Sequence, residues 1–114
     1  MNIQPLIQKD FYKQNHYRMY PENTGKIYSN LTPRKSRIEG VNHVVVFGIQ
    51  YFIKEYLMNQ WNSNFFTVPW NSVANNYKRI IDNTLGPDSV DLDHIKKLHG
   101  LGYLPLSIKA LPEG

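Results

Sequence analysis

The sequence predicts one α+β domain over residues 1–114, with an N-terminal helix, part of a mixed or antiparallel sheet, and three helices packed on it. The expected order of elements is helix, strand, strand, helix, helix, helix, strand. Strands and helices do not alternate in this order as they do in a doubly wound parallel sheet. A chain of 114 residues with 41% hydrophobic residues is also long enough for one domain with its own core.

The first expected helix covers residues 8–20 and ends before Pro21, because proline disfavours helical geometry in the residue before it. Its side chains are mostly groups that bind ligands: Asp10, Tyr12, Lys13, His16, Tyr17, Arg18 and Tyr20. Such a helix has little apolar surface to bury, which favours a role other than core formation. A polar helix that is simply solvated is the alternative.

Three stretches have the pattern of strands. Residues 26–31 follow the turn sequence 22–25 and alternate between apolar and polar side chains. Residues 43–47 are β-branched and apolar, which is typical of a strand buried on both faces. Residues 104–111 alternate again. We therefore expect these stretches to form the sheet.

Three further helices follow from apolar periodicity. Residues 49–57 carry an apolar stripe that the sequence Asn62-Ser63-Asn64 is expected to end. A second helix is expected from about Thr67 to Gly86, with Pro69 in its first turn. A third begins after Ser89 or Asp91 and is expected to end at Gly100.

Composition excludes several classes of site. The chain has no cysteine, so it has no disulfide, zinc–thiolate site or thiol nucleophile. No stretch has the length and apolar character of a signal peptide or membrane span, so we expect a soluble, cytoplasmic protein without a membrane partner. His94 and His99 are five residues apart, which does not suit two metal ligands on one helix face.

The charge balance is basic, with 13 Lys and Arg against 9 Asp and Glu and a net charge of +4. This balance is compatible with phosphates or nucleic acid as ligands. The loop at residues 32–40 contains Arg34, Lys35 and Arg37, and Tyr28 precedes it. Either a solvated loop or a surface for single-stranded nucleic acid fits this pattern.

Several segments match a known family in the correct order. They are Asp10-Phe11-Tyr12-Lys13, His16-Tyr17, Tyr20-Pro21, Asn23-Thr24, Lys26-Ile27-Tyr28-Ser29, Val46 to Tyr51, and Leu104 to Gly114. In these segments the chain resembles the N-terminal region of nicotinamide phosphoribosyltransferases. Nicotinate phosphoribosyltransferases share the general plan, but the Asp-x-Tyr-Lys-x-x-His-Tyr opening is more similar to the nicotinamide branch.

The resemblance implies the N-terminal part of a longer enzyme, with a barrel-like catalytic domain outside this chain and active sites at the boundary of a homodimer. The expected end of the last strand, close to Gly114, also suggests a cut chain. The implied reaction joins nicotinamide to 5-phosphoribosyl 1-pyrophosphate and yields nicotinamide mononucleotide and pyrophosphate, with Mg²⁺. The 114 residues alone are then not expected to be active.

The resemblance also implies roles for three residues. Tyr12 matches a tyrosine that stacks on the nicotinamide ring across the dimer, and Arg34 matches an arginine near the substrate phosphates. Asp10, next to this tyrosine, is expected to shape the base pocket. Phe11 departs from the family pattern, as does Thr32-Pro33, which leaves the direction of Arg34 open. No residue of the chain is assigned to catalysis or to Mg²⁺.

Three alternatives remain open from the sequence. The first is the nicotinate branch of the same enzymes. The second is a stand-alone basic module that binds nucleic acid through Lys26, Arg34, Lys35 and Arg37, although nucleic acid is not the expected partner. The third is a catalytically inert remnant.

Overall fold

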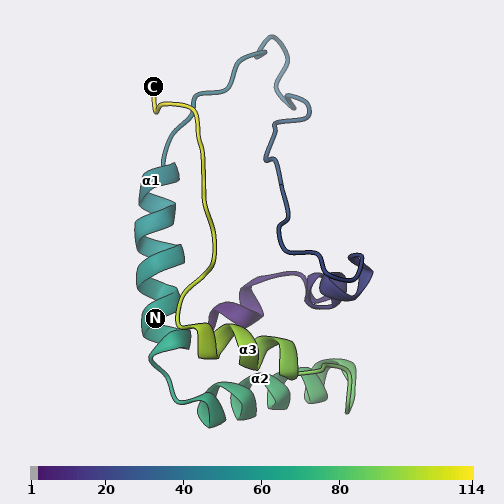
Figure 1. Cartoon of the computed structure of the whole chain (residues 1–114). Coiled ribbons are helices and arrows are strands. Elements are labelled where there is room, and N and C mark those ends of the chain that lie inside the picture. The colour runs from purple at the N-terminus through teal and green to yellow at the C-terminus, as the bar shows by residue number, and fades with distance from the viewer. Residues whose placement is uncertain (1–2) are drawn as a thin grey trace.

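The computed structural model describes residues 3–114, and within this range it contains helices and irregular segments but no strand (Figure 1). The helical elements in chain order are η1 (Pro5–Gln8), η2 (Phe11–Met19), α1 (Ile49–Tyr51), η3 (Phe52–Gln60), η4 (Asn62–Phe66), α2 (Trp70–Leu85) and α3 (Asp93–Leu101). The predicted α+β fold with a sheet is therefore wrong.

All three stretches expected to be strands lie in irregular chain. A strand is held by a ladder of hydrogen bonds to a neighbouring strand. Within the described residues, the C-terminal segment is joined to residues 43–47 by one backbone bond, from Gly114 N–H to the Val46 carbonyl at 3.1 Å. Val44 and Val45 are more than 70% exposed, rather than buried on both faces. The apolar patterns report β propensity, and propensity without a pairing partner does not make a sheet.

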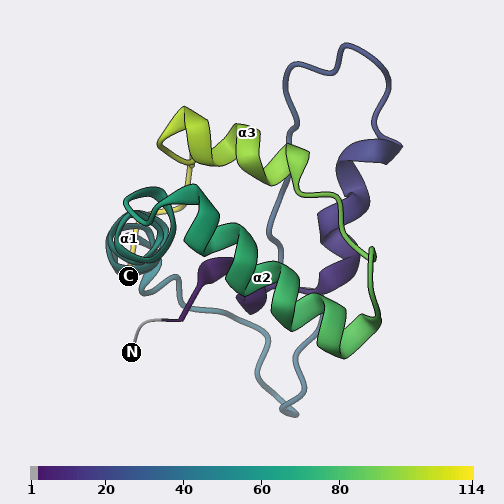
Figure 2. The ribbon, with the colours of Figure 1, turned by 90° about the horizontal axis from the view of Figure 1, so that it is seen from below.

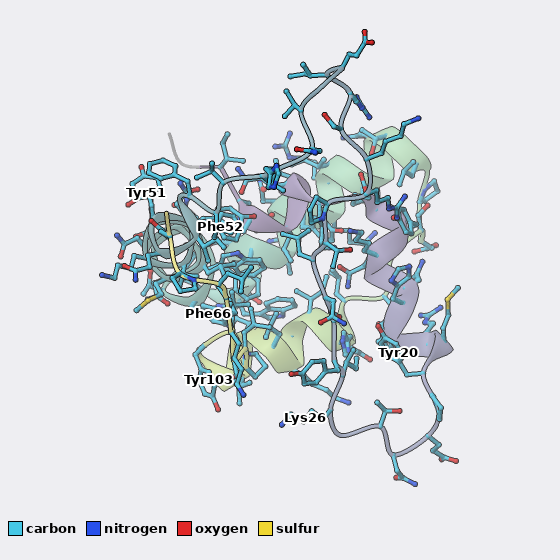
Figure 3. All side chains as sticks on the ribbon, turned by 90° about the horizontal axis from the view of Figure 1, so that it is seen from above. Tyr20, Lys26, Tyr51, Phe52, Phe66 and Tyr103 are labelled. Atoms are coloured by element: carbon cyan, nitrogen blue, oxygen red, sulfur yellow. The ribbon has the colours of Figure 1, made fainter. Side chains whose placement is uncertain are left out.

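The predicted N-terminal helix is divided into two short 3-10 helices. Lys9 ends η1 with φ −122° and ψ 161°, and Asp10 precedes η2 with φ −62° and ψ 130°, so both residues are extended. The predicted end before Pro21 is confirmed, since Tyr20 leaves the helical region. The turn after it is confirmed as well, because Asn23 has a φ of +66°. Tyr20 and Lys26, labelled in Figure 3, bracket this turn.

Residues 49–66 form one long helix, in which α1, η3 and η4 follow one another through Trp61. Gly48 precedes it with φ +83°. The turns are wide, with i to i+5 hydrogen bonds such as Thr67 N–H to the Asn62 carbonyl at 3.0 Å. The predicted break at Asn62-Ser63-Asn64 is therefore wrong. Phe65 is fully buried, and its burial overrides the weak helix propensity of the asparagines.

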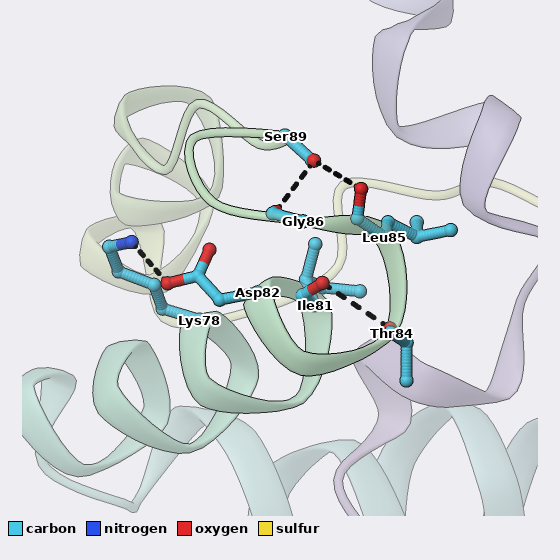
Figure 4. Close-up of polar contacts among 7 residues, drawn as sticks. All are labelled: Lys78, Ile81, Asp82, Thr84, Leu85, Gly86 and Ser89. Carbon is cyan, nitrogen blue, oxygen red and sulfur yellow. Dashed lines mark hydrogen bonds and ion pairs between the residues drawn. The ribbon is translucent and has the colours of Figure 1, made fainter.

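The C-terminal end of α2 agrees with the sequence, whereas the helix begins at Trp70 rather than near Thr67, and Pro69 precedes its first turn. Pro69 lies at its N-cap, and Gly86 ends it with φ +100°. Beyond this end, the single O–H of Ser89 is shared between the carbonyls of Gly86 at 2.7 Å and Leu85 at 3.1 Å (Figure 4). These bonds satisfy carbonyls that have no partner inside the helix.

Both ends of α3 are defined by residues near the predicted ones. The N-cap position of α3 is Leu92, which makes no side-chain capping bond, and the carboxylate of the preceding Asp91 accepts the Asp93 N–H at 2.9 Å. At its end, Gly102 adopts φ +86°, whereas Gly100 remains inside the helix. The predicted end at Gly100 was therefore two residues early.

The hydrophobic core lies where η1, the end of the long helix, α2 and α3 meet. Its buried members are Leu6, Trp61, Phe65, Val73, Tyr77, Ile81 and Ile95. The rings of Trp61 and Phe65 meet edge to face at 5.2 Å, a preferred aromatic geometry. Figures 1 and 2 show residues 21–48 as an arm that leaves these helices. Residues 21–45 of the arm are exposed throughout.

Candidate functional site

The start of η2 carries two of the residues expected to contact the substrate. Asp10 occupies the N-cap position, and its backbone carbonyl accepts the Lys13 N–H at 3.1 Å. Its exposed carboxylate makes no capping bond within the described residues. Tyr12 is 60% exposed, and its ring meets the edge of His16 at 5.2 Å. Both side chains are therefore accessible to a ligand or to another subunit.

Other residues of η2 attach this helix to the rest of the helical body. Gln14 is buried, and Tyr17 stacks on His94 of α3 with ring centroids 4.0 Å apart. The next residue, Arg18, forms an ion pair with Asp91 at 3.4 Å. η2 thus supplies one fully buried residue, Gln14, and packs Phe11 against the core, while most of its other side chains are half-buried or exposed.

Arg34 lies in the exposed arm, away from the start of η2 along the chain. The ion pairs within residues 3–114 join Arg18 to Asp91 and Lys78 to Asp82 (the latter drawn in Figure 4), so Arg34 takes part in neither. Asp10 and Tyr12 lie together at the start of η2, and within the described residues no hydrogen bond or ion pair joins Arg34 to them. An ion pair would fix its direction, and without one the long side chain remains adaptable.

Three polar groups near η2 have shifted pKa values. Burial lowers the pKa of Lys9 below the usual lysine value and raises the pKa of the Tyr77 phenol. The pKa of Arg18 is raised, first by its hydrogen bond to the Tyr17 hydroxyl and then by the nearby Asp91. The contacts of Lys9, Gln14 and Tyr17 were not expected from the sequence. They join residues in and beside η2 to distant helices, which no local spacing indicates.

The two histidines of α3 have structural partners. His94 is stacked on Tyr17, and His99 donates through Nε2 to the Val68 carbonyl at 2.7 Å. Within residues 3–114, no three His, Asp or Glu side chains gather as a metal site would require. The same part of the chain has no helix that is long and apolar enough to cross a membrane.

Comparison with known proteins identifies the family. A sequence profile described as the nicotinamide phosphoribosyltransferase N-terminal domain matches residues 4–64. A curated relative named nicotinamide phosphoribosyltransferase, from Acinetobacter baylyi (strain ATCC 33305 / BD413 / ADP1), is 49% identical over 117 aligned residues. The alignment covers 98% of this chain and 23% of the relative, so the chain spans about a quarter of the relative's length. No solved structure matches this chain.

These matches favour the nicotinamide branch over the nicotinate branch, since both carry the nicotinamide name. They also agree with the segments between Asp10 and Ser29 that carry the resemblance in the sequence, because residues 4–64 contain all of them. The chain belongs to the nicotinamide phosphoribosyltransferase family and represents its N-terminal domain.

Proposed function

We propose that this chain is the N-terminal domain of a longer enzyme that transfers ribose 5-phosphate from 5-phosphoribosyl 1-pyrophosphate to nicotinamide. The products are nicotinamide mononucleotide and pyrophosphate, a step of NAD biosynthesis. Family membership and 49% identity to a nicotinamide phosphoribosyltransferase support the proposal. A barrel-like catalytic domain outside these residues would complete the active site.

The structural observation that carries the proposal is the exposure of Tyr12 on a helix that Tyr17 and Arg18 anchor to the helical body. Its ring is 60% exposed although η2 is fixed through Tyr17 and Arg18. When the nicotinamide ring nitrogen attacks the sugar carbon, the neutral pyridine becomes a cation. A tyrosine face attracts a cation more strongly than a neutral ring, by about 0.5–2 kcal/mol. This interaction grows along the reaction and therefore raises its rate.

Asp10 is assigned to the base pocket beside Tyr12. The two residues flank Phe11 at the start of η2, and the carboxylate is exposed. An ionised carboxylate accepts hydrogen bonds and does not donate them, which suits the amide N–H groups of nicotinamide. It would repel the carboxylate of nicotinate. Asp10 would thereby favour the amide over the acid.

Arg34 is assigned to the phosphate groups of the donor. Its guanidinium is always charged and presents a planar fork of donors that fits phosphate oxygens. Mg²⁺ would neutralise charge on the pyrophosphate leaving group. The described residues hold no cluster of three possible ligands, so they do not fit a metal site of their own. In this proposal Mg²⁺ arrives with the pyrophosphate oxygens and water.

We also infer a homodimer in the cytoplasm. A residue that stacks on substrate from a separate subunit must project from its own body, and the exposure of Tyr12 is compatible with this arrangement. A reducing compartment suits a chain with no cysteine.

The experiment that tests the proposal is a base-competition assay on the complete protein. Nicotinamide and nicotinate are supplied together with 5-phosphoribosyl 1-pyrophosphate and Mg²⁺, and both mononucleotides are quantified by chromatography. We expect nicotinamide mononucleotide to dominate. If nicotinate mononucleotide were the main product, the protein would be a nicotinate phosphoribosyltransferase instead. If neither mononucleotide formed, the transferase function would be contradicted.

A further inference from the structure

A pocket of about 190 Å³ lies where η1 and η2 meet α3, and none of Asp10, Tyr12 and Arg34 lines it. Its polar lining consists of Lys9, Lys13, Gln14, Tyr17, Trp61 and His94. Two of these side chains are lysines and none is acidic. The pocket therefore offers an excess of hydrogen-bond donors and positive charge, which favours an anion.

The lysine at the η1–η2 junction is held in place from two sides. The Lys9 ammonium donates to the Oε1 atom of Gln14, whose side chain is buried. It also lies 5.9 Å from the centre of the Tyr77 ring. An ammonium has three N–H donors, so the bond to Gln14 leaves donors for a ligand. Burial lowers the pKa of Lys9, and an anion nearby would offset that cost.

Trp61 also lines the pocket. Its side chain is only 9% exposed, and its indole nitrogen is buried without a hydrogen-bond partner in the described part of the chain. An indole N–H only donates, and this nitrogen has almost no surface that an acceptor in the pocket could reach. Trp61 therefore contributes ring surface to the pocket wall and no hydrogen bond to a ligand.

The apolar lining decides which kind of anion fits. Leu6, Ile95 and Leu98 complete the wall, and all three are aliphatic. The rings of Tyr17 and His94 lie 4.0 Å apart and within 5° of parallel, so no other ring can enter between them. An aliphatic chain matches this wall better than a flat aromatic ring does.

We propose that this pocket binds a short-chain aliphatic carboxylate. The carboxylate receives hydrogen bonds from Lys9 and Lys13, and the chain packs on the wall of Leu6, Ile95 and Leu98. This site is separate from the proposed nicotinamide site and does not depend on the transferase function.

The test is isothermal titration calorimetry of the complete protein with hexanoate at neutral pH, with hexan-1-ol as a neutral probe of equal chain length. We expect saturable binding of hexanoate at one site per chain and much weaker binding of hexan-1-ol. Lys9→Met should weaken hexanoate binding about tenfold or more, because a hydrogen bond to a charged group is worth about 1.5–3 kcal/mol.

Two control variants show whether binding depends on this pocket. Lys97→Met removes the same charge from an exposed position on α3 that does not line the pocket, and it should leave binding unchanged. Tyr12→Ala should also leave binding unchanged, whether or not the transferase function is correct. Circular dichroism checks the fold of each variant, and Lys13→Met replaces Lys9→Met if the latter does not fold.

The proposal would be overturned if hexanoate did not bind, or if hexan-1-ol bound as tightly as hexanoate. It would also be overturned if Lys9→Met and Lys97→Met weakened hexanoate binding equally, or if Tyr12→Ala weakened it. Inorganic phosphate is titrated as well, and binding as tight as that of hexanoate would show a general anion site instead of a carboxylate pocket.

Discussion

The ring of Tyr17 lies face to face with the imidazole of His94, with centroids 4.0 Å apart and planes within 5° of parallel. Beside it, Arg18 pairs with Asp91 at 3.4 Å. These contacts join η2 to α3 and to the turn that precedes it, across more than 70 residues of sequence. They fix the helix that carries Tyr12, so the position of the proposed base-stacking residue depends on them.

The stack predicts a measurable loss of stability. Tyr17→Ala should lower the free energy of unfolding by about 1 kcal/mol, since aromatic pairs contribute about 0.5–1.5 kcal/mol beyond their buried area. The ion pair of Arg18 is exposed and should add little to this. Urea denaturation measures the effect. Tyr28→Ala is the matched control, because Tyr28 is 80% exposed and should change stability by less than about 0.5 kcal/mol. Equal effects of the two substitutions would contradict the role of the stack.

The two glycines at the end of α3 should respond in opposite directions to alanine. Gly102 has φ +86°, where an L-residue is strained, so Gly102→Ala should destabilise the chain by about 1–2 kcal/mol. Gly100 is helical, so Gly100→Ala should stabilise it by about 0.5–1 kcal/mol. A new Cβ would meet no described atom within 4 Å at either position, so only backbone conformation differs. Thermal unfolding of the two variants compares them. If Gly100→Ala lowered the stability and Gly102→Ala did not, the helix would end at Gly100.

The shifted pKa of Lys9 predicts a dependence of stability on pH. Burial lowers its pKa from 10.5 in the folded protein. Between that lowered value and 10.5, the unfolded chain holds a proton that the folded chain has lost, so the free energy of unfolding rises with pH. Lys9→Met should remove this rise, as measured by urea denaturation at a series of pH values.

The titration of Tyr77 limits the highest pH at which this comparison can be made. Burial raises its pKa above 10.0, so above this pH the folded protein keeps a proton that the unfolded chain releases, and stability falls. The comparison between wild type and Lys9→Met is therefore made below pH 10.0. Identical slopes for the two proteins in this range would show that Lys9 is not the cause.

Arg34 should affect the phosphate-bearing substrate specifically. In the complete protein, Arg34→Ala should raise the KM for 5-phosphoribosyl 1-pyrophosphate about tenfold or more, because hydrogen bonds to charged groups are worth about 1.5–3 kcal/mol. The KM for nicotinamide should change little. Arg37→Ala removes the same charge from the same exposed arm and serves as the control. An effect confined to nicotinamide would contradict the assignment of Arg34.

The sequence predicted the helices better than it predicted the fold class. Pro21 and Gly86 act through their own backbone geometry, so the ends that they impose could be predicted locally. A sheet depends on pairing between distant segments, and the apolar residues around Val45 could not reveal that this pairing is missing from the described residues. Burial of Phe65 extends the long helix beyond Asn62, a tertiary effect that local propensity does not contain.

The candidate site residues came from the resemblance and not from any pattern that the fold explains. Resemblance to a family selected Asp10 and Tyr12, and the structure places both at the accessible start of η2. Their proposed contacts with substrate remain predictions. The environment of Lys9 and Trp61 could not be predicted, since it is assembled from η1, η2, the long helix and α3.

The most direct test of the central claim is the steady-state kinetics of Tyr12→Ala and Tyr12→Phe in the complete protein, with nicotinamide varied at saturating 5-phosphoribosyl 1-pyrophosphate. Stacking on a developing cation requires an aromatic face, and its loss should cost about 0.5–2 kcal/mol, or a roughly two- to thirtyfold fall in kcat/KM for nicotinamide. Tyr12→Phe keeps the face and should stay close to wild type. Unchanged kinetics in Tyr12→Ala, or an equal fall in both variants, would contradict the stacking role.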